Sequence, residues 1–586
     1  MKQINTEVVV IGGGATGAGT IRDLAMRGFD AVLLERADIA QGTTGRFHGL
    51  LHSGGRYVIS DPRSATECAE ENEIVRRIHA DAVEETGGFF VVTPYDDESH
   101  SDKFLQAAAE TRVPAAEISV AEALQREPRL HPGTKRVFEV RDGTIDGWKM
   151  TWGAIESAKT YGAQVFTYQR AVDIIVRDGT VQAVVAVDEK TGERTQFNCR
   201  FLINCGGPWA GQIASLAGIE GVDVVPGRGI MVAMNHRLVN SVINRCVYPA
   251  DGDIVVPAHT VCIIGTTDEA AADPDFLEIK ESEVQKMLDA GEAMIPGFRN
   301  SRAVHVWAGA RPLVKDKRVS ATDTRHMSRG MSILEHGERD GIHGMLTIAG
   351  GKLTTYRLMA KNVVDVMCEL LGEERECKTD KEAVPSANSG RTHKVSDRLA
   401  QREADRLDDQ IICECELVTR AMIEKELRKT PNANIDDLRR KLRIGMGPCQ
   451  GGFCSLRTAG IMHDFTKARD RKAREGDPAA SAEIADRSST MLRLFLGNRQ
   501  QGIRPLMFGQ QLHEAVLDQW IFEGALDLQH LPNPSRDAMR ATGDLALNHG
   551  RHDGLRPTGF EPPRDDVKTT DGDVSERAIA TEAEEV

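Results

Sequence analysis

The sequence predicts an α/β protein in which a Rossmann-type dinucleotide-binding domain is interleaved with an antiparallel β-sheet and followed by a small helical module with a cysteine cluster. Three observations predict this class. A strand, a glycine turn, a helix and a second strand open the chain, two more apolar strands that end in glycines follow far downstream, and four cysteines form two close pairs. At 586 residues the chain exceeds a single core, so roughly three or four structural units are expected.

The start of the chain is typical of a βαβ unit. Apolar strands are predicted at residues 7–11 and 31–34, with a helix over 18–27 between them. Three glycines in the turn fit the G-x-G-x-x-G pattern, in which the backbone approaches a pyrophosphate at a helix N-terminus. An acidic residue ends the second strand, where a carboxylate accepts hydrogen bonds from ribose hydroxyls. The pattern residues are Gly12, Gly14, Gly17 and Glu35.

Two later segments repeat the strand-to-glycine pattern. The strand at 201–204 leads to Gly206 and Gly207, and the strand at 345–348 leads to Gly350 and Gly351. Alternating segments with DG turns between them predict antiparallel hairpins. An NAD domain would complete its site within one continuous run, so three separate segments favour the longer cofactor FAD. Lys352 would then place positive charge near the flavin N1–C2 carbonyl.

Arginines in glycine-rich or apolar surroundings indicate an anion site. Arg56 lies in the glycine-rich segment 43–57, Arg311 follows W-A-G-A, and Arg329 follows a serine. Converging guanidinium groups would suit a phosphate dianion through bidentate, charge-assisted hydrogen bonds. The alternative is that each arginine is a solvated surface group.

The cysteine quartet consists of a C-x-C pair, Cys413 and Cys415, and a C-x4-C pair, Cys449 and Cys454. Four thiolates in this pairing can hold a [2Fe–2S] cluster or a structural zinc ion. The C-x-C pair is tighter than the usual zinc spacing and therefore favours iron–sulfur. A cluster attached to a flavin domain would let electrons leave the protein one at a time.

Charge and hydropathy exclude several partner classes. The net charge of −15 argues against nucleic acids and anionic lipid surfaces, because both bind clustered basic residues. No apolar run reaches the roughly 18 residues of a membrane-spanning helix, so membrane association would require a partner. The other seven cysteines are scattered and predict no disulfide framework, which indicates a reducing cytoplasm.

Composition also suggests where the units begin and end. Residues 1–375 would form the oxidoreductase domain, with cofactor-binding segments at about 1–90, 145–225 and 340–375 and substrate-domain segments between them. The polar stretch 376–408 is interpreted as a linker, 409–465 as the cysteine module, and 466–535 as a helical region suited to subunit docking. The acidic tail, 536–586, is expected to be disordered because it lacks apolar residues.

The motifs IGGGATGAG, HSGGRY, GARPL, IAGGKLTTYR and CEC with GMGPCQGGFC resemble those of FAD-dependent glycerol-3-phosphate dehydrogenases, from residue 5 to about 530. The fused cysteine module resembles the bacterioferritin-associated-ferredoxin-like [2Fe–2S] module in the large catalytic subunit of the anaerobic, multisubunit form. The resemblance implies a D-amino-acid-oxidase-like FAD fold and favours [2Fe–2S] over zinc. It further implies oxidation of sn-glycerol 3-phosphate to dihydroxyacetone phosphate. Electrons would pass to quinone through partner subunits of the B and C types, the latter an iron–sulfur membrane anchor, which would hold the protein on the inner face of the cell membrane.

Site residues follow from the resemblance, position by position. It assigns the substrate phosphate to Arg56, Arg311 and Arg329, and the reacting end to His52 and Tyr57. Single-subunit relatives carry a histidine where this chain has Gly229, so His52 becomes the candidate base, with water or Lys352 as alternatives. The implied FAD contacts are Gly12, Gly14, Gly17, Glu35, Thr43, Thr44, His48, Gly206, Gly207, Gly350, Gly351, Lys352, Leu353 and Thr354, with His48 alternatively a packing residue.

Two rival functions remain open at this point. One is another flavin-dependent dehydrogenase, acting on a 2-hydroxy acid of the 2-hydroxyglutarate type or on an amino acid, although a carboxylate needs fewer arginines than a phosphate does. The other is a non-catalytic flavin scaffold whose cysteine module binds zinc and docks another protein.

Overall fold

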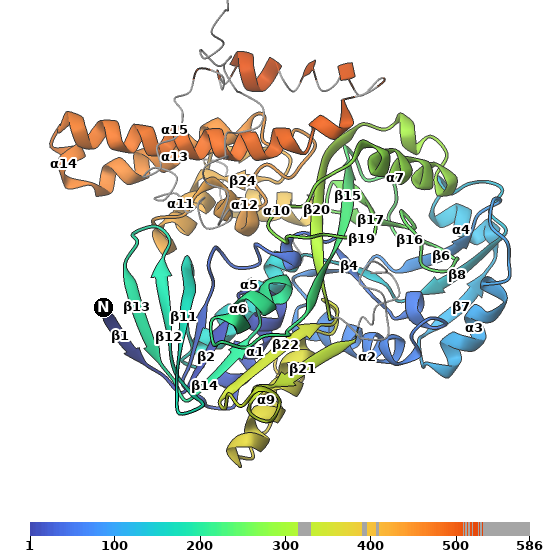
Figure 1. Cartoon of the computed structure of the whole chain (residues 1–586). Helices are drawn as coiled ribbons and strands as arrows, with labels where there is room; N and C mark the ends of the chain where they lie inside the picture. The colour runs from blue at the N-terminus through green and yellow to red at the C-terminus, as the bar shows by residue number, and fades with distance from the viewer. Residues whose placement is uncertain are drawn as a thin grey trace, which may run out of the picture.

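The computed structural model describes residues 1–314, 330–389, 395–405 and 409–507, and parts of 509–530. The acidic tail predicted from the sequence lies outside these residues. Figure 1 shows two parts of the chain side by side. One is the domain formed mainly by the segments at about 1–90, 145–225 and 340–375, called the flavin-type domain below, and the other is a large mixed sheet. The helices of the cysteine module lie across both. This arrangement confirms the predicted fold class.

The first layer is a six-stranded sheet in which the three strand-to-glycine segments are direct neighbours. The first, middle and last of these strands pair in parallel, although they come from widely separated parts of the chain. Their carboxyl ends, and hence their glycines, therefore meet at one edge. In sheet order the strands are β10 (Gln164–Phe166), β3 (Ala31–Leu34), β2 (Val8–Ile11), β14 (Phe201–Asn204), β22 (Met345–Gly350) and β21 (Met331–Glu335).

Helices and a second sheet cover the two faces of this layer. Helix α1 (Ala15–Met26) packs against α5 (Gly147–Thr160) and α9 (Tyr356–Leu371) over one common apolar core. Helix α1 begins before the predicted residue 18, because Gly14 is extended and acts as its N-cap. The other face packs on a four-stranded sheet that contains the predicted DG hairpin, β1 (Lys2–Asn5), β13 (Arg194–Asn198), β12 (Thr180–Asp188) and β11 (Gln169–Arg177).

A nine-stranded sheet forms the second large layer, and its two longest strands, β15 (Val224–Met234) and β20 (Ala303–Val314), pair along their whole length. A short sheet of β4 (Leu50–Leu51), β9 (Gly143–Ile145) and β5 (Val83–Glu84) lies between the layers. The remaining strands of the large sheet are β6 (Gly88–Val92), β7 (Ala115–Ile118), β8 (Arg136–Val140), β16 (Val242–Arg245), β17 (Ile254–Ala258), β18 (Val261–Gly265) and β19 (Glu269–Ala270). Helices outside the first layer include α2 (Pro62–Ile78), α3 (Ser101–Glu110), α4 (Val120–Arg126), α6 (Ala210–Ser215), α7 (Glu281–Met294) and α8 (His336–Asp340).

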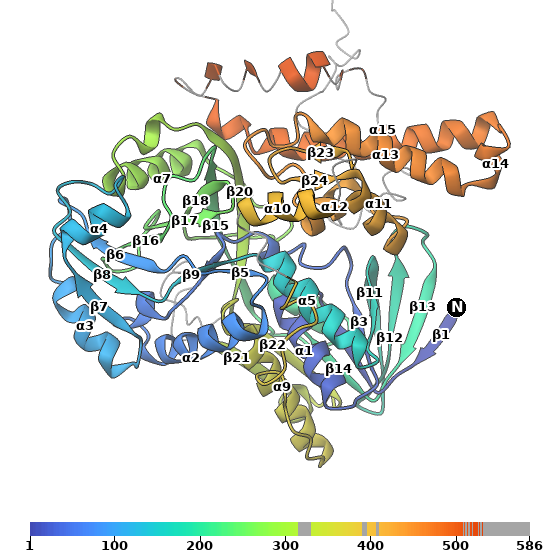
Figure 2. The ribbon, with the colours of Figure 1, turned by 180° about the vertical axis from the view of Figure 1, so that it is seen from behind.

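The cysteine module is helical and has its own core. Helix α15 (Pro478–Gln501) packs along α13 (Cys454–Arg469), and its residues Leu492 and Leu496 enter the same core as Leu438 of α12 (Ile435–Leu442). Figure 2 shows α12 above α5 of the flavin-type domain. The module contains β23 (Ile411–Cys413), β24 (Val418–Thr419), α10 (Val395–Asp405), α11 (Arg420–Lys429), α12 (Ile435–Leu442), α13 (Cys454–Arg469), α14 (Arg471–Arg474) and α15 (Pro478–Gln501). Across the described residues, no helix combines the length and the apolarity that a bilayer crossing requires.

Candidate functional site

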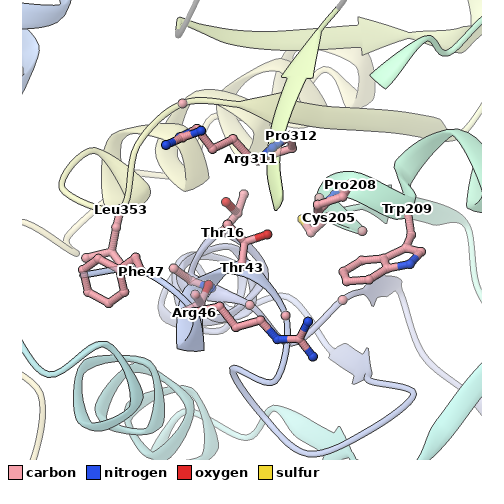
Figure 3. A pocket seen from close by; sticks show the side chains of 18 of the residues that line it. Thr16, Thr43, Arg46, Phe47, Cys205, Pro208, Trp209, Arg311, Pro312 and Leu353 are labelled. Atoms are coloured by element: carbon pink, nitrogen blue, oxygen red, sulfur yellow. The ribbon is translucent and has the colours of Figure 1, made fainter. Parts of the chain in front are cut away.

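A cavity of about 630 Å³ opens where the glycine ends of β2, β14 and β22 face the end of β20. All three strand-to-glycine segments line it, as does the glycine-rich segment 43–57. Figure 3 shows Arg311 and Leu353 towards one end of the space and Trp209 towards the other. An elongated site built from separate segments fits a dinucleotide, which is longer than a single nucleotide.

The glycine turn that opens α1 leaves no room for side chains. Gly12 has φ of +111°, and a Cβ there would lie 2.5 Å from the carbonyl oxygen of Cys205. A Cβ on Gly17 would lie 1.8 Å from the carbonyl oxygen of Gly12. The N-cap Gly14 carries no side chain, and Gly14, Ala15 and Thr16 line the cavity, so the positive end of the α1 dipole faces the space where phosphate oxygens would bind. This cradle fits a pyrophosphate.

Glu35 is fixed by two backbone donors. Its Oε2 accepts a hydrogen bond from the N–H of Gly13 at 2.6 Å, and its Oε1 accepts one from the N–H of Ala37 at 2.9 Å. Each carboxylate oxygen keeps a second lone pair, and the side chain lines the cavity, which suits the ribose hydroxyls of an adenosine.

The loop after β3 is tied to both layers by adjacent threonines. Thr44 Oγ1 accepts a hydrogen bond from the N–H of Ala15 at 2.9 Å, and Thr43 Oγ1 donates one to the carbonyl oxygen of Ala310 at 2.5 Å. Arg46, which was not among the predicted site residues, also lines the cavity. Burial and the nearby Arg36 lower the pKa of Arg46.

The two histidines of this loop have different roles. His48 Nδ1 accepts a hydrogen bond from the N–H of Leu50 at 3.1 Å, which leaves its proton on Nε2. Burial, with Arg56 and Arg311 nearby, lowers the pKa of His48 to about 3, so it stays neutral at working pH. The ring of His52 lies 6.2 Å from His48 and 5.4 Å from Tyr57 between centroids. The backbone N–H of His52 donates to Thr354 Oγ1 at 3.1 Å.

Two of the three predicted phosphate arginines reach the cavity, and each holds a buried carboxylate. Arg56 Nη1 lies 2.6 Å from Asp253 Oδ2, and Arg311 Nη1 lies 3.1 Å from Asp268 Oδ1. Burial alone would lower the pKa of Arg56, but the charge of Asp253 and its hydrogen bond raise it above the ordinary value. The third, Arg329, lies outside the described residues. Sequence reasoning missed both aspartates, because only the strand order brings them to the arginines.

Gly229 faces a filled space. It lies on β15, opposite Gly309 of β20. A Cβ at Gly229 would lie 2.2 Å from Thr266 Oγ1 and 2.9 Å from Arg311 Nη2. Thr266 and Arg311 are themselves hydrogen-bonded at 3.2 Å. A histidine side chain has no room here, which agrees with the departure from single-subunit relatives noted in the sequence.

The third strand-to-glycine segment brings a cation into the cavity, on the side of His52 and Tyr57. Lys352 Nζ donates to Ser64 Oγ at 2.7 Å and lies 4.6 Å from the centroid of the Tyr57 ring. Lys352, Leu353 and Thr354 line the cavity together with His52. On the middle segment, the N–H of Gly206 donates to Asn204 Oδ1 at 3.0 Å.

The four cysteines of the quartet come together in pairs, Cys413 with Cys454 and Cys415 with Cys449. A hydrogen bond from the Cys415 thiol lowers the pKa of Cys449 to about 6 in spite of burial, with help from the N–H groups of residues 451–453. A hydrogen bond from the Cys454 thiol likewise lowers the pKa of Cys413. Within the described chain, no three His, Cys, Asp or Glu side chains converge on one metal position. Two thiol pairs fit a two-iron cluster better than a single tetrahedral zinc.

The scattered cysteines behave as buried apolar residues. Burial raises the pKa of each of five thiols to about 12, so none is a nucleophile or a ligand at neutral pH. These are Cys68, Cys199, Cys205, Cys246 and Cys262.

Comparison with known families and proteins agrees with both halves of the structure. The FAD dependent oxidoreductase family matches residues 7–357, and the BFD-like [2Fe-2S] binding domain matches residues 411–464. The chain is 37% identical over 565 residues to the A subunit of anaerobic glycerol-3-phosphate dehydrogenase from Haemophilus influenzae, covering 92% of this chain and 97% of that protein.

Two further relatives and one solved structure are similar to the chain. The corresponding A subunit of Escherichia coli K12 is 36% identical over 90% of this chain and 97% of its own length, and the A1 subunit of Haloferax volcanii is 36% identical over 93% of each. The structure of a Bacillus halodurans glycerol-3-phosphate dehydrogenase complexed with FAD covers 93% of this chain and 94% of its own, with a TM-score of 0.53 and 20% identity. That last likeness concerns the fold alone.

Proposed function

The chain belongs to the family of FAD-dependent anaerobic glycerol-3-phosphate dehydrogenase A subunits, with FAD and a [2Fe–2S] cluster as its cofactors, and from this premise we propose how its residues serve the reaction. Family membership sets aside the 2-hydroxy-acid, amino-acid and non-catalytic alternatives. The observation that carries the proposal is the meeting of Arg56, Arg311, His52 and Lys352 in one cavity that the three strand-to-glycine segments also line.

We propose that the substrate phosphate binds between Arg56 and Arg311. Both guanidinium groups line the cavity, and planar forks suit two phosphate oxygens each. Their carboxylate partners, Asp253 and Asp268, fix the side chains before substrate arrives. The rest of the substrate would then point towards Leu353, at the end of the cavity opposite Trp209. Lys352, which precedes Leu353, also lines the cavity.

His52 is proposed as the base. FAD, when bound, supplies the acceptor for the hydride from substrate C2. The proton of the C2 hydroxyl must go to a group that can hold it, and His52 lies among Tyr57, His48 and Thr354 at this end. His48 does not compete for that proton, because its pKa of about 3 is too low. The hydride carries both electrons away from the substrate, and the proton of the hydroxyl is transferred to the imidazole of His52.

We propose that electrons leave through the cysteine quartet to other subunits of a multisubunit complex, and through them to quinone at the inner face of the cell membrane. The relatives that match this chain over nearly their whole length are named as A subunits, which supports a complex of several subunits. A cluster that carries one electron at a time suits a delivery in single steps.

An anaerobic titration with glycerol 3-phosphate, followed by absorbance and EPR, tests this function. Flavin bleaching should come first and a reduced-cluster signal second. The His52→Asn variant should bleach about a hundredfold more slowly, the usual size of a lost general base. Absence of bleaching in the wild-type protein would overturn the proposal. Normal bleaching in His52→Asn at every pH would remove His52 from the role.

A further inference from the structure

We propose that Arg443 is a positioning residue that fixes the cysteine module on the flavin-type domain for the electron step between the two centres. The proposal rests on the proposed function, in which electrons pass from the FAD site to the quartet. It concerns the side chains that join the two parts of the chain.

Arg443 bridges the two parts directly. Its Nε lies 3.3 Å from Glu416 Oε2, and its Nη1 lies 3.3 Å from Asp146 Oδ2. Glu416 follows the cluster residue Cys415 in the chain, whereas Asp146 is the N-cap of α5 in the flavin-type domain. Arg443 itself has φ of +65°, a left-handed conformation that is costly for a residue other than glycine. The chain therefore accepts backbone strain where this side chain turns towards Asp146.

The two acids of the C-E-C-E segment face opposite ways. Glu416 is 1% exposed and also accepts from Arg398 Nη1 at 2.9 Å, while His259 Nδ1 lies 3.6 Å away. Glu414 is 60% exposed and pairs with Arg457, which is 46% exposed. Glu416 therefore takes part in the contact between the cysteine module and the flavin-type domain, whereas Glu414 forms an ion pair that faces solvent.

On the far side of this interface, direct contacts lead to the FAD cavity. Gly147 follows Asp146, and a Cβ on Gly147 would lie 2.7 Å from the Phe47 ring and 2.9 Å from the carbonyl oxygen of Thr44. Phe47 and Thr44 both line the cavity. The cluster loop and the cofactor loop are therefore joined through Glu416, Arg443 and the start of α5.

A second anchor lies one turn earlier on α12. The Arg440 guanidinium is buried between Asp38 of the flavin-type domain and Asp436 and Asp437 of its own helix. Tyr168 Oη donates to Asp437 Oδ1 at 2.6 Å from the other side. Buried ion pairs of this kind tolerate one geometry, because any shift leaves a charge without its partner. Together the anchors hold α12, and the cluster loops packed on it, in one orientation.

Arg443 is the better residue to change, because a substitution at Arg440 would leave two buried carboxylates, Asp38 and Asp437, without their cation. After Arg443→Met, Glu416 keeps Arg398 and Asp146 keeps its two backbone donors. Arg457→Met is the matched control. It removes the same charge beside the same loop, from the solvent-facing side.

The test is rapid anaerobic mixing of the holoenzyme with glycerol 3-phosphate. Each substrate molecule yields two electrons. The [2Fe–2S] cluster held by the quartet would accept them one at a time and pass them to an added one-electron oxidant such as ferricenium. In Arg443→Met, the rate of flavin bleaching should stay within about twofold of wild type. The rate of cluster reduction should fall by about tenfold or more, because the cysteine module is no longer held in one orientation on the flavin-type domain. Arg443→Lys should recover part of the rate.

Hydrogen exchange gives a readout that does not depend on turnover. In the full-length protein, amides of residues 435–445 should exchange faster in Arg443→Met and remain unchanged in Arg457→Met, because Arg457 contacts Ile412 and Glu414 instead. Wild-type cluster reduction and exchange in Arg443→Met would overturn the proposal. Equal slowing in Arg457→Met would overturn it too, since charge rather than docking would then be the cause. A wild-type flavin that fails to bleach refutes the proposed function, while the exchange comparison still judges the docking.

Discussion

At the scale of single residues, the site combines fixed cations with neutral groups. Arg56 and Arg311 are oriented by buried aspartates, so their forks are set before a ligand arrives. His48 stays neutral and can only donate through Nε2. In the proposed mechanism, acid–base work belongs to the imidazole of His52 and phosphate recognition to the guanidinium groups.

Arg56→Lys should weaken substrate binding more than turnover. Lysine keeps the charge and can still reach Asp253, but it loses the planar fork, so KM for glycerol 3-phosphate should rise about tenfold, the size of a lost charge-assisted hydrogen bond, with a smaller change in kcat. Steady-state kinetics with an artificial acceptor measure the split. Arg63→Lys is the matched control, because Arg63 is exposed and pairs with Glu67 on the surface. A KM within twofold of wild type would speak against phosphate binding at Arg56.

At the scale of elements, β20 brings Arg311 to the cavity, and β15 supports β20 by pairing with it along its length. Their pairing brings Gly229 opposite Gly309. At both positions, other parts of the protein lie so close that a side chain would overlap them. The close approach places Thr266 and Arg311 where a side chain at position 229 would lie. The two glycines therefore leave room for Thr266, Arg311 and Arg46 at this side of the cavity.

Gly229→Ala should disturb this strand pair without removing the flavin. The new methyl group would overlap Thr266 Oγ1 and displace Arg311, so kcat/KM should fall about tenfold or more while the flavin spectrum is retained. Gly460→Ala, in α13 with open space around it, is the control and should be neutral or slightly stabilising. Unchanged kinetics in Gly229→Ala would mean that the strand pair relaxes freely.

Local patterns predicted much of this arrangement and none of its cross-links. The glycine motif, Glu35 and the three apolar strands were readable because each is a short signal with its own geometry. The proximity of Asp253 to Arg56 was not readable, since it depends on how β17 follows β16 in the large sheet. Similarly, Leu496 of α15 shares a core with the cysteine module, although a polar connector separates them in sequence.

At the scale of the whole molecule, stability depends on histidines buried as neutral groups. His79 has no exposed surface, and its Nε2 lies 2.5 Å from Tyr356 Oη, between α2 and α9. Burial, with a contribution from Arg22, lowers the pKa of His79 to about 3. An unfolded histidine titrates near about 6.5, so the unfolded chain binds the extra proton between these values. Stability conferred by neutral His79 is therefore present above about pH 6.5 and is lost as pH falls towards 3.

His79→Gln should reduce the acid sensitivity of the fold. As pH falls below 6, His79 should lower the free energy of unfolding of the wild-type protein by about 1.4 kcal/mol for each pH unit. The variant should lack this contribution. Thermal unfolding at pH 7.5 and pH 5 compares the two proteins. The variant is expected to be less stable at pH 7.5, where its amide replaces a packed ring. Parallel curves across the range would contradict the assignment.

The strand order of the flavin-type sheet also governs when the cofactor can be acquired during synthesis. β22 lies beside β14, and the third glycine segment reaches the cavity only after it. A growing chain therefore has no complete FAD site until residues near 357 have left the ribosome, whereas the four cluster cysteines, at 413–454, are made later still. Flavin loading should accordingly precede iron loading, and cells starved of iron should accumulate a yellow, cluster-free protein rather than an empty one.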